Sequence, residues 1–442
     1  MDIRSIALQS LIDICKKDAY SNIVVSQTIK RYRFDDRDRR FYTELVYGTV
    51  RYLNYLDWIM ARLSTRKLDK LDPLCLLILR LGLFQIHILS KVPDSAACNE
   101  SVKLATRLGN PGMAKFVNAI LRSSIRRRNE FVIPSLEENP VLHISLTYHQ
   151  PKWLVEKWIH DYGCDDTVKI CQYFEEIPDL CVRTNTARIS REDLLKRFQD
   201  QGLEAVPAHL APEGIYLKGI PNISSITEIS EGLCQIQDEP SMLASRVLAP
   251  SPQSIIFDVC AAPGGKTTHL AALAGDKSMV YGFDIYQHKL NLIEANAQTL
   301  GLKNIRALLQ DGCTIGDTHA DQADYVLVDA PCSGLGVLKR KLDLRWRKRP
   351  EDLKTLPKLQ RRILESAAAC VKPGGVLVYS TCTMNDDENI HVIEDFLEKH
   401  SEFTAEDARS FIPVGGDGPF IQLLPQRDHL DGFFIARLKK GV

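Results

Sequence analysis

The second half of the chain repeats a short apolar run followed by an amphipathic stretch, and this rhythm restricts the fold more than any other feature. Near-continuous apolar strands that alternate with helices are typical of a parallel sheet covered on both faces. The runs are SIIFDVC, SMVYGFDI, IRALLQDG, ADYVLVDA, GVLVYSTC and GFFIARLKK. Because ligands of such sheets bind beyond the carboxyl ends of the strands, we expect a functional site at that edge.

The first half of the chain lacks this alternation and shows mainly helical patterns, followed by a short mixed segment. Apolar residues recur with helical spacing in residues 39–60, and residues 72–89 begin with Asp and Pro, as a capped helix does. Further along, LCVRTN, SREDLLKRFQDQG and GIYLKG alternate strand, helix and strand. These patterns predict an all-helical domain over 1–135, a small α+β domain over 140–235 and a catalytic domain over 236–442.

Charge and cysteine usage limit the class of protein. Lys and Arg balance Asp and Glu at 56 each, but residues 1–135 hold 23 basic and 13 acidic residues. This excess indicates a polyanion at that end, although merely solvated helices would look the same. The longest apolar stretch is interrupted by Arg80 and His87, which favours a buried helix over a membrane span. Twelve cysteines without a CxxC pair, and no HExxH, predict no disulfide framework and no metal site, and fit a reducing cytoplasm.

The stretch DVCAAPGGKTTHLAALAG, which starts at Asp258, predicts a strand, a Gly-rich turn and a helix. Cys260 stands where a P-loop needs glycine, and GxGxxG is absent. The next two strands end in Asp284, which could bridge ribose hydroxyls, and Asp311, which could accept from an adenine amino group. Each Asp alone could be a helix cap. Together they repel phosphates and attract a cation, so S-adenosylmethionine is the predicted ligand.

Two cysteines, Cys332 in DAPCSG and Cys382 in YSTC, follow the ends of apolar strands. Most free cysteines are small buried hydrophobes. However, a thiolate that adds to C6 of cytosine lets C5 attack a methyl sulfonium, and a base must then remove the C5 proton. One thiol for attack and one for elimination would explain the pair. Asp329 could hold N3 and the exocyclic amine of a base that has left its stack.

A basic segment, LKRKLDLRWRKRP at 338–350, follows the Cys332 turn with seven basic residues and one tryptophan. This combination suits a single RNA strand, with neutralised phosphates and a stacked base, whereas elsewhere a solvated loop would be the default. Segments 31–40 and 126–128 are secondary candidates for phosphate contact. The predicted RNA contacts are Lys339, Arg340, Arg345, Trp346 and Arg347.

The motifs CAAPGGKTTHLA, DAPCSG and YSTCTMNDDEN resemble those of the RNA 5-methylcytosine methyltransferases. With DRRFYTELVYGTVR and KFVNAILR, which resemble the antitermination factor NusB, nearly the whole chain resembles the Sun (RsmB) branch. That branch modifies a cytosine in bacterial small-subunit ribosomal RNA. The resemblance implies an α/β fold: a seven-stranded class I (Rossmann-like) methyltransferase sheet, preceded by an all-α NusB-like bundle and a small RRM-like α+β domain.

The resemblance also assigns residues. It makes Cys382 the nucleophile and Cys332 the thiol of elimination, with Asp329 and Lys266 as further catalytic residues. The implied cofactor residues are Cys260, Ala261, Ala262, Pro263, Gly264, Gly265, Lys266, Asp284, Asp311 and Asp329.

A reversed assignment of the thiols is open. DNA cytosine methyltransferases use a Pro-Cys nucleophile and a Glu-Asn pair, and this chain has Pro331-Cys332 and Glu388-Asn389. Glu388 comes after the second cysteine, where a favourable charge near a helix start is a sufficient explanation.

The expected activity is S-adenosylmethionine-dependent methylation of cytosine C5 in 16S ribosomal RNA through a covalent cysteine–C6 adduct. Transfer RNA is the alternative substrate, and a non-catalytic RNA-binding or antitermination factor is the alternative class. The expected partner is ribosomal RNA, and we expect a cytoplasmic monomer without metal or membrane.

Overall fold

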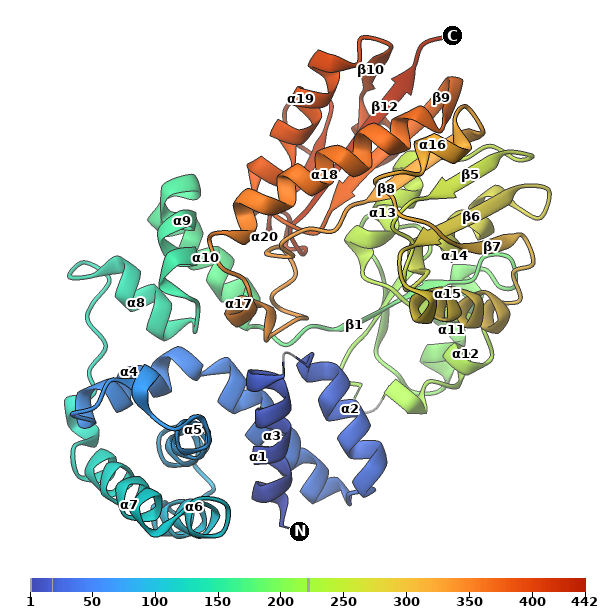
Figure 1. The fold of residues 1–442 in the computed structure, drawn as a ribbon. Coiled ribbons are helices and arrows are strands. Elements are labelled where there is room, and N and C mark those ends of the chain that lie inside the picture. The colour runs from blue at the N-terminus through green and yellow to red at the C-terminus, as the bar shows by residue number, and fades with distance from the viewer. Residues whose placement is uncertain (1, 18, 221–222) are drawn as a thin grey trace. The chain divides into compact units, whose positions relative to one another are not determined.

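The computed structural model describes residues 2–17, 19–220 and 223–442 (Figure 1). The chain forms two compact units, one of Met1–Glu175 with Leu338–Lys348 and one of Glu176–Val337 with Arg349–Val442. The segment that follows the Cys332 turn therefore belongs to the first unit, and the chain then returns to the second. The three-domain boundaries that we drew from sequence patterns stay a prediction.

All regular elements in the described residues of the first unit are helices. Its central helix α5 (Pro73–His87) begins at the predicted cap, where Asp72 Oδ1 accepts from the main-chain N–H groups of Leu74 and Cys75. Leu77, Ile78 and Phe84 of this helix are buried in the core of the unit. The other helices are α1 (Ile3–Lys16), α2 (Ser21–Tyr32), α3 (Asp36–Arg51), α4 (Leu53–Leu63), α6 (Asp94–Leu108), α7 (Pro111–Arg126), α8 (Pro140–Thr147), α9 (Lys152–Tyr162), α10 (Cys164–Glu175), α17 (Leu344–Arg347) and the 3-10 turns Leu68–Lys70 and Arg128–Glu130.

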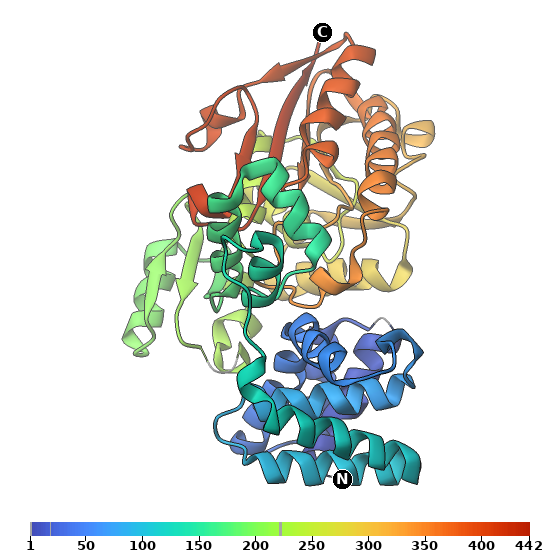
Figure 2. The ribbon, with the colours of Figure 1, turned by 90° about the vertical axis from the view of Figure 1, so that its left-hand side faces the viewer.

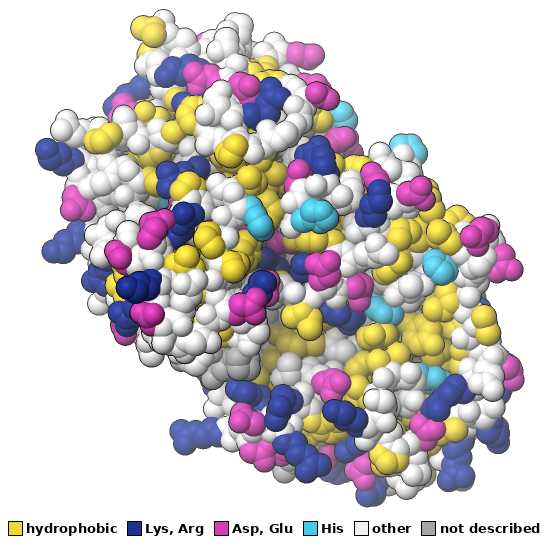
Figure 3. All heavy atoms as spheres, turned by 180° about the vertical axis from the view of Figure 1, so that it is seen from behind, with side chains coloured by type: hydrophobic (Ala, Val, Ile, Leu, Met, Phe, Trp, Pro, Cys, Tyr) yellow, Lys and Arg dark blue, Asp and Glu magenta, His cyan; other side chains and the backbone are white. Residues whose placement is uncertain are grey.

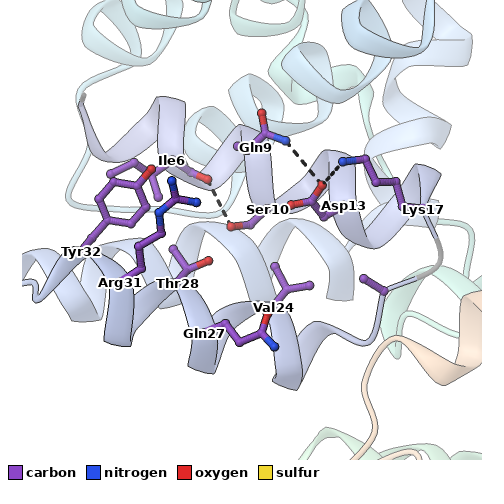
Figure 4. A pocket seen from close by; sticks show the side chains of 11 residues that line it. Ile6, Gln9, Ser10, Asp13, Lys17, Val24, Gln27, Thr28, Arg31 and Tyr32 are labelled. Atoms are coloured by element: carbon purple, nitrogen blue, oxygen red, sulfur yellow. Dashed lines mark hydrogen bonds and ion pairs between the residues drawn. The ribbon is translucent and has the colours of Figure 1, made fainter.

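A groove of about 310 Å³ runs between α1 and α2 (Figure 4). The Asp13 carboxylate in this groove accepts from Gln9 Nε2 at 3.4 Å and forms an ion pair with Lys17 at 2.9 Å. Because these side chains already satisfy one another, we assign no ligand to the groove.

The large sheet of the second unit has the strand order β10-β12-β9-β8-β5-β6-β7, with the short β11 paired to β12. Strands β9, β8, β5, β6 and β7 are parallel, and β12 and β10 join antiparallel. The strands are β5 (Ile255–Asp258), β6 (Met279–Asp284), β7 (Ile305–Leu309), β8 (Ala323–Asp329), β9 (Val371–Thr381), β10 (Phe403–Glu406), β11 (Ile421–Leu423) and β12 (Phe433–Lys440). The predicted seven-stranded sheet is confirmed, with β11 as an addition.

Helices cover both faces of this sheet, as Figures 1 and 2 show for the orange α18 and α19 on one side. Alternate residues of β8 and β9 point to opposite faces. Leu327 and Val378 join the core beneath α13 and α14, whereas Val328 and Leu377 join the core beneath α18 and α19. The helices are α13 (Glu239–Leu248), α14 (Gly265–Ala274), α15 (Gln287–Leu300), α16 (Gly316–His319), α18 (Asp352–Ala369), α19 (Ile390–Lys399), α20 (Pro425–Asp428) and the 3-10 turns Asp386–Glu388 and Ala408–Phe411.

A small antiparallel sheet precedes the large one in the same unit. Its order is β2-β3-β1-β4, and its elements are β1 (Leu180–Thr184), α11 (Arg191–Asp200), β2 (Ala205–Pro207), β3 (Gly214–Leu217), the 3-10 turn Ile223–Ser225, α12 (Thr227–Ser230) and β4 (Cys234–Ile236). Arg183 of β1 is fully buried and donates to the Gly265 carbonyl at 2.5 Å and to the Thr268 hydroxyl at 3.0 Å. The small sheet thereby supports the start of α14, next to the Gly-rich turn. Among the helices of the described ranges, none is long and apolar enough to cross a membrane.

Candidate active site

The carboxyl ends of β8 and β9 bring Cys332 and Cys382 together. These strands are parallel neighbours with Asp329 opposite Ser380 in register, so the turns that follow them lie at one edge of the sheet. The two Sγ atoms are 3.3 Å apart. At this separation one thiol can donate its proton to the other sulfur.

A lysine and a carboxylate lie beside the thiols. Lys266 Nζ is 2.6 Å from Asp329 Oδ2, and the Ser380 hydroxyl donates to Asp329 Oδ1 at 2.9 Å. Burial works against the charge of Lys266, but the Asp329 carboxylate more than offsets it and raises the pKa of the lysine. Lys266 is therefore a permanent cation near Cys382, and a cation favours a thiolate in its vicinity.

Cys332 holds its proton tightly. Its hydrogen bond with Cys382, together with burial and nearby negative charges, raises the pKa of the Cys332 thiol well above its ordinary value. Cys332 is thus protonated in the free protein at neutral pH, and either sulfur of the pair can be the donor in their hydrogen bond.

The Gly-rich turn between β5 and α14 has a backbone that only glycine permits at one position. Gly264 has φ +101°, and a Cβ placed there would lie 3.0 Å from the Ile293 Cα. The Pro263 carbonyl accepts from Asn296 Nδ2 at 2.8 Å, which fixes the turn against α15. Cys260 in this turn is a poor nucleophile, because burial raises the pKa of its thiol.

Carboxylates stand at the ends of the strands next to this turn. Asp284 accepts from the Tyr286 main-chain N–H at 3.1 Å, and the exposed Asp311 accepts from that of Cys313 at 2.9 Å. Both bonds close local turns. Neither carboxylate is the N-cap of the helix that follows, because α15 begins at the cap Tyr286 and α16 at the cap Ile315, both without a side-chain cap bond. Their oxygens keep further acceptor capacity for the hydroxyl and amino groups of a nucleoside.

Asp258, at the end of β5, is the buried member of this group. The Thr267 hydroxyl donates to its Oδ2 at 2.7 Å, while its Oδ1 has no hydrogen-bond partner among the residues the structure describes. Burial, with smaller contributions from neighbouring acidic groups such as Asp329, raises the pKa of Asp258 to about 7. A cationic ligand would relieve this cost, so the residues present fit S-adenosylmethionine.

One of the predicted RNA contacts in the basic segment, Arg345, needs correction. Arg345 is fully buried, donates to the His149 carbonyl at 3.0 Å and pairs with Glu175 at 3.3 Å. Trp346 donates to the Val50 carbonyl at 2.7 Å, and Arg347 pairs with Asp343 at 2.7 Å. The prediction of an RNA contact is therefore wrong for Arg345, whose guanidinium stabilises the first unit instead. The indole N–H of Trp346 and the guanidinium of Arg347 are likewise engaged within the protein.

Lys339 and Arg340 remain partly exposed. Lys339 Nζ lies 4.0 Å from the centre of the Tyr173 ring. An RNA contact at these two residues stays a prediction.

The sequence interpretation also missed residues around the thiols. Glu388, which we interpreted as a charge near a helix start, is fully buried and accepts from the main-chain N–H of Ser333 at 2.8 Å. Gln360 and Asn389 lie in the same network. The Glu-Asn pair is visible in the sequence, but its partners come from distant segments, so no spacing reveals them.

The sheet order, the Gly-rich turn after β5 and the carboxylates at the following strand ends define a class I S-adenosylmethionine methyltransferase. The family model "16S rRNA methyltransferase RsmB/F" matches residues 245–439, the NusB family model matches 1–126, and the ferredoxin-like domain model of RsmF/B-like methyltransferases matches 150–224.

Relatives of similar length support this class. A probable ribosomal RNA small subunit methyltransferase B of Bacillus subtilis is 39% identical, over 99% of this chain and 98% of its own. The corresponding Synechocystis protein is 37% identical, over 99% of both chains. The chain belongs to the RsmB family of 16S rRNA methyltransferases, which depend on S-adenosylmethionine.

Solved structures share the fold. The crystal structure of PH0851 is 27% identical with a TM-score of 0.85, and the match covers 99% of this chain and 98% of that one. The structure of NSun6 from Pyrococcus horikoshii with SFG is 25% identical with a TM-score of 0.59, and the match covers 66% of this chain and 98% of that one.

Replacing Arg345 by Ala should destabilise the first unit by about 3 kcal/mol, because the Glu175 carboxylate and the His149 carbonyl lose a buried donor. All four tryptophans lie in this unit, so their fluorescence during denaturant unfolding measures the change. Lys341→Ala, an exposed position of the same segment, is the control and should have little effect. An unchanged unfolding curve with a flattened salt dependence of RNA binding would restore the RNA-contact interpretation.

Affinity for S-adenosylmethionine should rise as the pH increases from 6 to 8, on the order of fivefold, because Asp258 with a pKa of about 7 becomes ionised in that range. Calorimetric titration at both pH values measures the effect. In Asp258→Asn the rise in affinity should disappear. This variant distinguishes the ionisation of Asp258 from that of the amino group of the ligand, which is the same in both proteins. Equal rises in both proteins would contradict a role for Asp258.

Proposed function

We propose that this protein methylates C5 of a cytosine in 16S rRNA through a covalent bond between the Cys382 sulfur and C6 of the base. The observation that carries this proposal is the 3.3 Å separation of the Cys332 and Cys382 sulfurs at the edge where Lys266 and Asp329 lie. Attack on the ring needs one thiol, and a second thiol at this distance is placed to act on the neighbouring carbon. A protein that only binds RNA has no use for either.

The turn at 260–266, with Asp284, Asp311 and Asp329, is the proposed cofactor site. Asp284 would accept from ribose hydroxyls and Asp311 from the adenine amino group. When bound, S-adenosylmethionine supplies an electrophilic methyl group. Asp329 contacts Lys266 of this turn and Ser380 of β9, and we assign its carboxylate to the amino group of the target cytosine.

In the first step the Cys382 thiolate adds to C6, and C5 becomes nucleophilic. Lys266 favours the thiolate form before attack through its positive charge. Once C5 carries the methyl group, the C5 proton must leave so that the C6–S bond can break. We assign its removal to the Cys332 thiolate, after which the Cys382 thiolate is released.

The contact between the thiols orders these steps. Cys382 is the main cause of the raised pKa of Cys332. When Cys382 becomes a thioether, it loses its charge and most of its strength as an acceptor, so the pKa of Cys332 falls. Cys332 can then release its proton to solvent and become a base only after the adduct has formed. Attack therefore prepares elimination.

The first unit supplies the proposed surface for RNA. Its basic excess at residues 1–135 is displayed in Figure 3, where Lys and Arg side chains gather along the lower part of the view. Lys339 and Arg340 are the remaining candidates near the Cys332 turn. Small-subunit ribosomal RNA is favoured over transfer RNA, because the full-length relatives are named as small-subunit rRNA methyltransferases.

A denaturing gel of the protein with 16S rRNA and S-adenosylmethionine tests the roles of the thiols. Cys332→Ala should accumulate a covalent protein–RNA band while methylated RNA release falls about a hundredfold, because elimination lacks its base. Cys382→Ala should form no band. Cys370→Ala, which changes a buried thiol away from the site, is the matched control. If the two results are exchanged, Cys332 is the nucleophile, and if no variant forms an adduct the covalent mechanism is wrong.

The partition between adduct and product should depend on pH. Because elimination requires deprotonated Cys332, whose pKa starts above its ordinary value, the ratio of trapped adduct to methylated RNA should fall about fivefold or more from pH 6.5 to 8.5. Quenched reactions on the same gel measure this ratio. It should be insensitive to pH in Cys332→Ala, and a pH-independent ratio in the wild type would exclude Cys332 as the base.

A further inference from the structure

The two turns that carry the thiols rest on a pair of consecutive buried residues. We propose that Glu388 and Asn389 are positioning residues: Glu388 fixes the turn of Cys332, and Asn389 fixes the turn of Cys382. The consequences for catalysis rest on the roles proposed above for the thiols, whereas the positioning itself does not.

Glu388 holds both neighbours of Cys332 in the chain. Its Oε2 accepts from the Ser333 main-chain N–H at 2.8 Å and from Gln360 Nε2 at 3.0 Å. The same Gln360 nitrogen donates to the Pro331 carbonyl at 3.0 Å. The residue before Cys332 and the residue after it are thus bound to one carboxylate–amide pair. Rotation of this turn would break these bonds.

Asn389 does the same for Cys382. The Thr381 hydroxyl donates to Asn389 Oδ1 at 2.5 Å, and Asn389 Nδ2 donates to the Thr383 carbonyl at 3.1 Å. A third bond, from Asn389 Nδ2 to Gln422 Oε1 at 2.9 Å, anchors the amide to β11. The residues on either side of Cys382 are therefore held by one side chain.

Further bonds join the two turns to each other. The hydroxyls of Ser333 and Thr383 are 2.8 Å apart, and the Gly336 main-chain N–H donates to the Cys382 carbonyl at 3.1 Å. With both turns fixed in this way, the network sets the distance between the two sulfurs.

The surroundings of Glu388 exclude a direct role in the chemistry. Its side chain is fully buried, and its second oxygen, Oε1, accepts from Asn385 Nδ2 at 3.2 Å. Among the described residues, the Glu388 carboxylate accepts from the Ser333 N–H, the Gln360 amide and the Asn385 amide, and it forms no ion pair. A buried carboxylate of this kind is costly unless each oxygen is hydrogen-bonded, and it has no free access to a substrate. Glu388 therefore acts through the Cys332 turn.

The two residues should fail at different steps. Glu388→Gln, which replaces one acceptor oxygen by a donor, should loosen the Cys332 turn, slow elimination about tenfold and accumulate the protein–RNA adduct. Asn389→Ala should loosen the Cys382 turn and lower the rate of adduct formation by a similar factor without accumulation. If Asn389→Ala does not fold, Thr381→Val removes only one hydroxyl bond and should act in the same direction. Glu394→Gln, at an exposed site on α19, is the matched control.

A second measurement needs neither RNA nor cofactor. Diamide accepts two hydrogens from two thiols as the S–S bond forms, so the rate of the Cys332–Cys382 disulfide, followed by peptide mass spectrometry, reports their proximity. Glu388→Gln and Asn389→Ala should slow it about fivefold or more relative to the wild type and Glu394→Gln, because sulfurs that move apart rarely meet. Unchanged disulfide rates would overturn the positioning role whatever the catalytic result. Slower disulfide formation with no RNA adduct in any protein would uphold the positioning role and reject the covalent mechanism instead.

Discussion

The pairing of β8 with β9 is the constraint on which the site depends. Parallel neighbours end at the same edge of a sheet, and the register that sets Asp329 opposite Ser380 delivers the two following turns to one place. Each turn needs only a short stretch of chain to bring its thiol to the other. The Gly-rich turn after β5, the next strand along, supplies Lys266 to Asp329 by the same geometry. Strand order therefore assembles residues that lie far apart in the sequence.

Buried polar groups then refine what the sheet has assembled. Strand pairing fixes where each turn begins, but the backbone of the turn can still move. Hydrogen bonds to Glu388 and Asn389 fix the residues that flank each cysteine. Arg183 supports the start of α14 in a comparable way from the small sheet. In each case a buried side chain holds the main chain next to a residue for which we propose a role in catalysis or cofactor binding. Such groups are costly to bury, and their bonds are therefore rarely dispensable.

The chain crosses between the two units more than once, and this limits where the protein can be truncated. The chain passes from the second unit into the first at Leu338, a few residues after Cys332, and returns to the second at Arg349. Arg345 and Trp346 anchor that excursion in the helical unit through Glu175 and the Val50 carbonyl. Removal of the helical unit would therefore strip a buried segment of its partners, and it would not yield an intact catalytic unit.

The sequence by itself determined the elements, because a strand buried on both faces must be apolar along its length and a capped amphipathic helix carries its own period and end signals. It also placed Cys332, Cys382 and the strand-end carboxylates at one edge, since parallel strands leave no other arrangement. The short strands β10 and β11 were not predicted, because runs of three or four residues are too short to show an apolar pattern. Only the tertiary structure decided which polar side chains are buried. The guanidinium of Arg345 is buried because Glu175 and His149 accept its hydrogen bonds, and the carboxylate of Glu388 is buried because Ser333 and Gln360 donate to it. Burial of a charge is set by partners that the fold brings from afar, and the local sequence does not encode those partners.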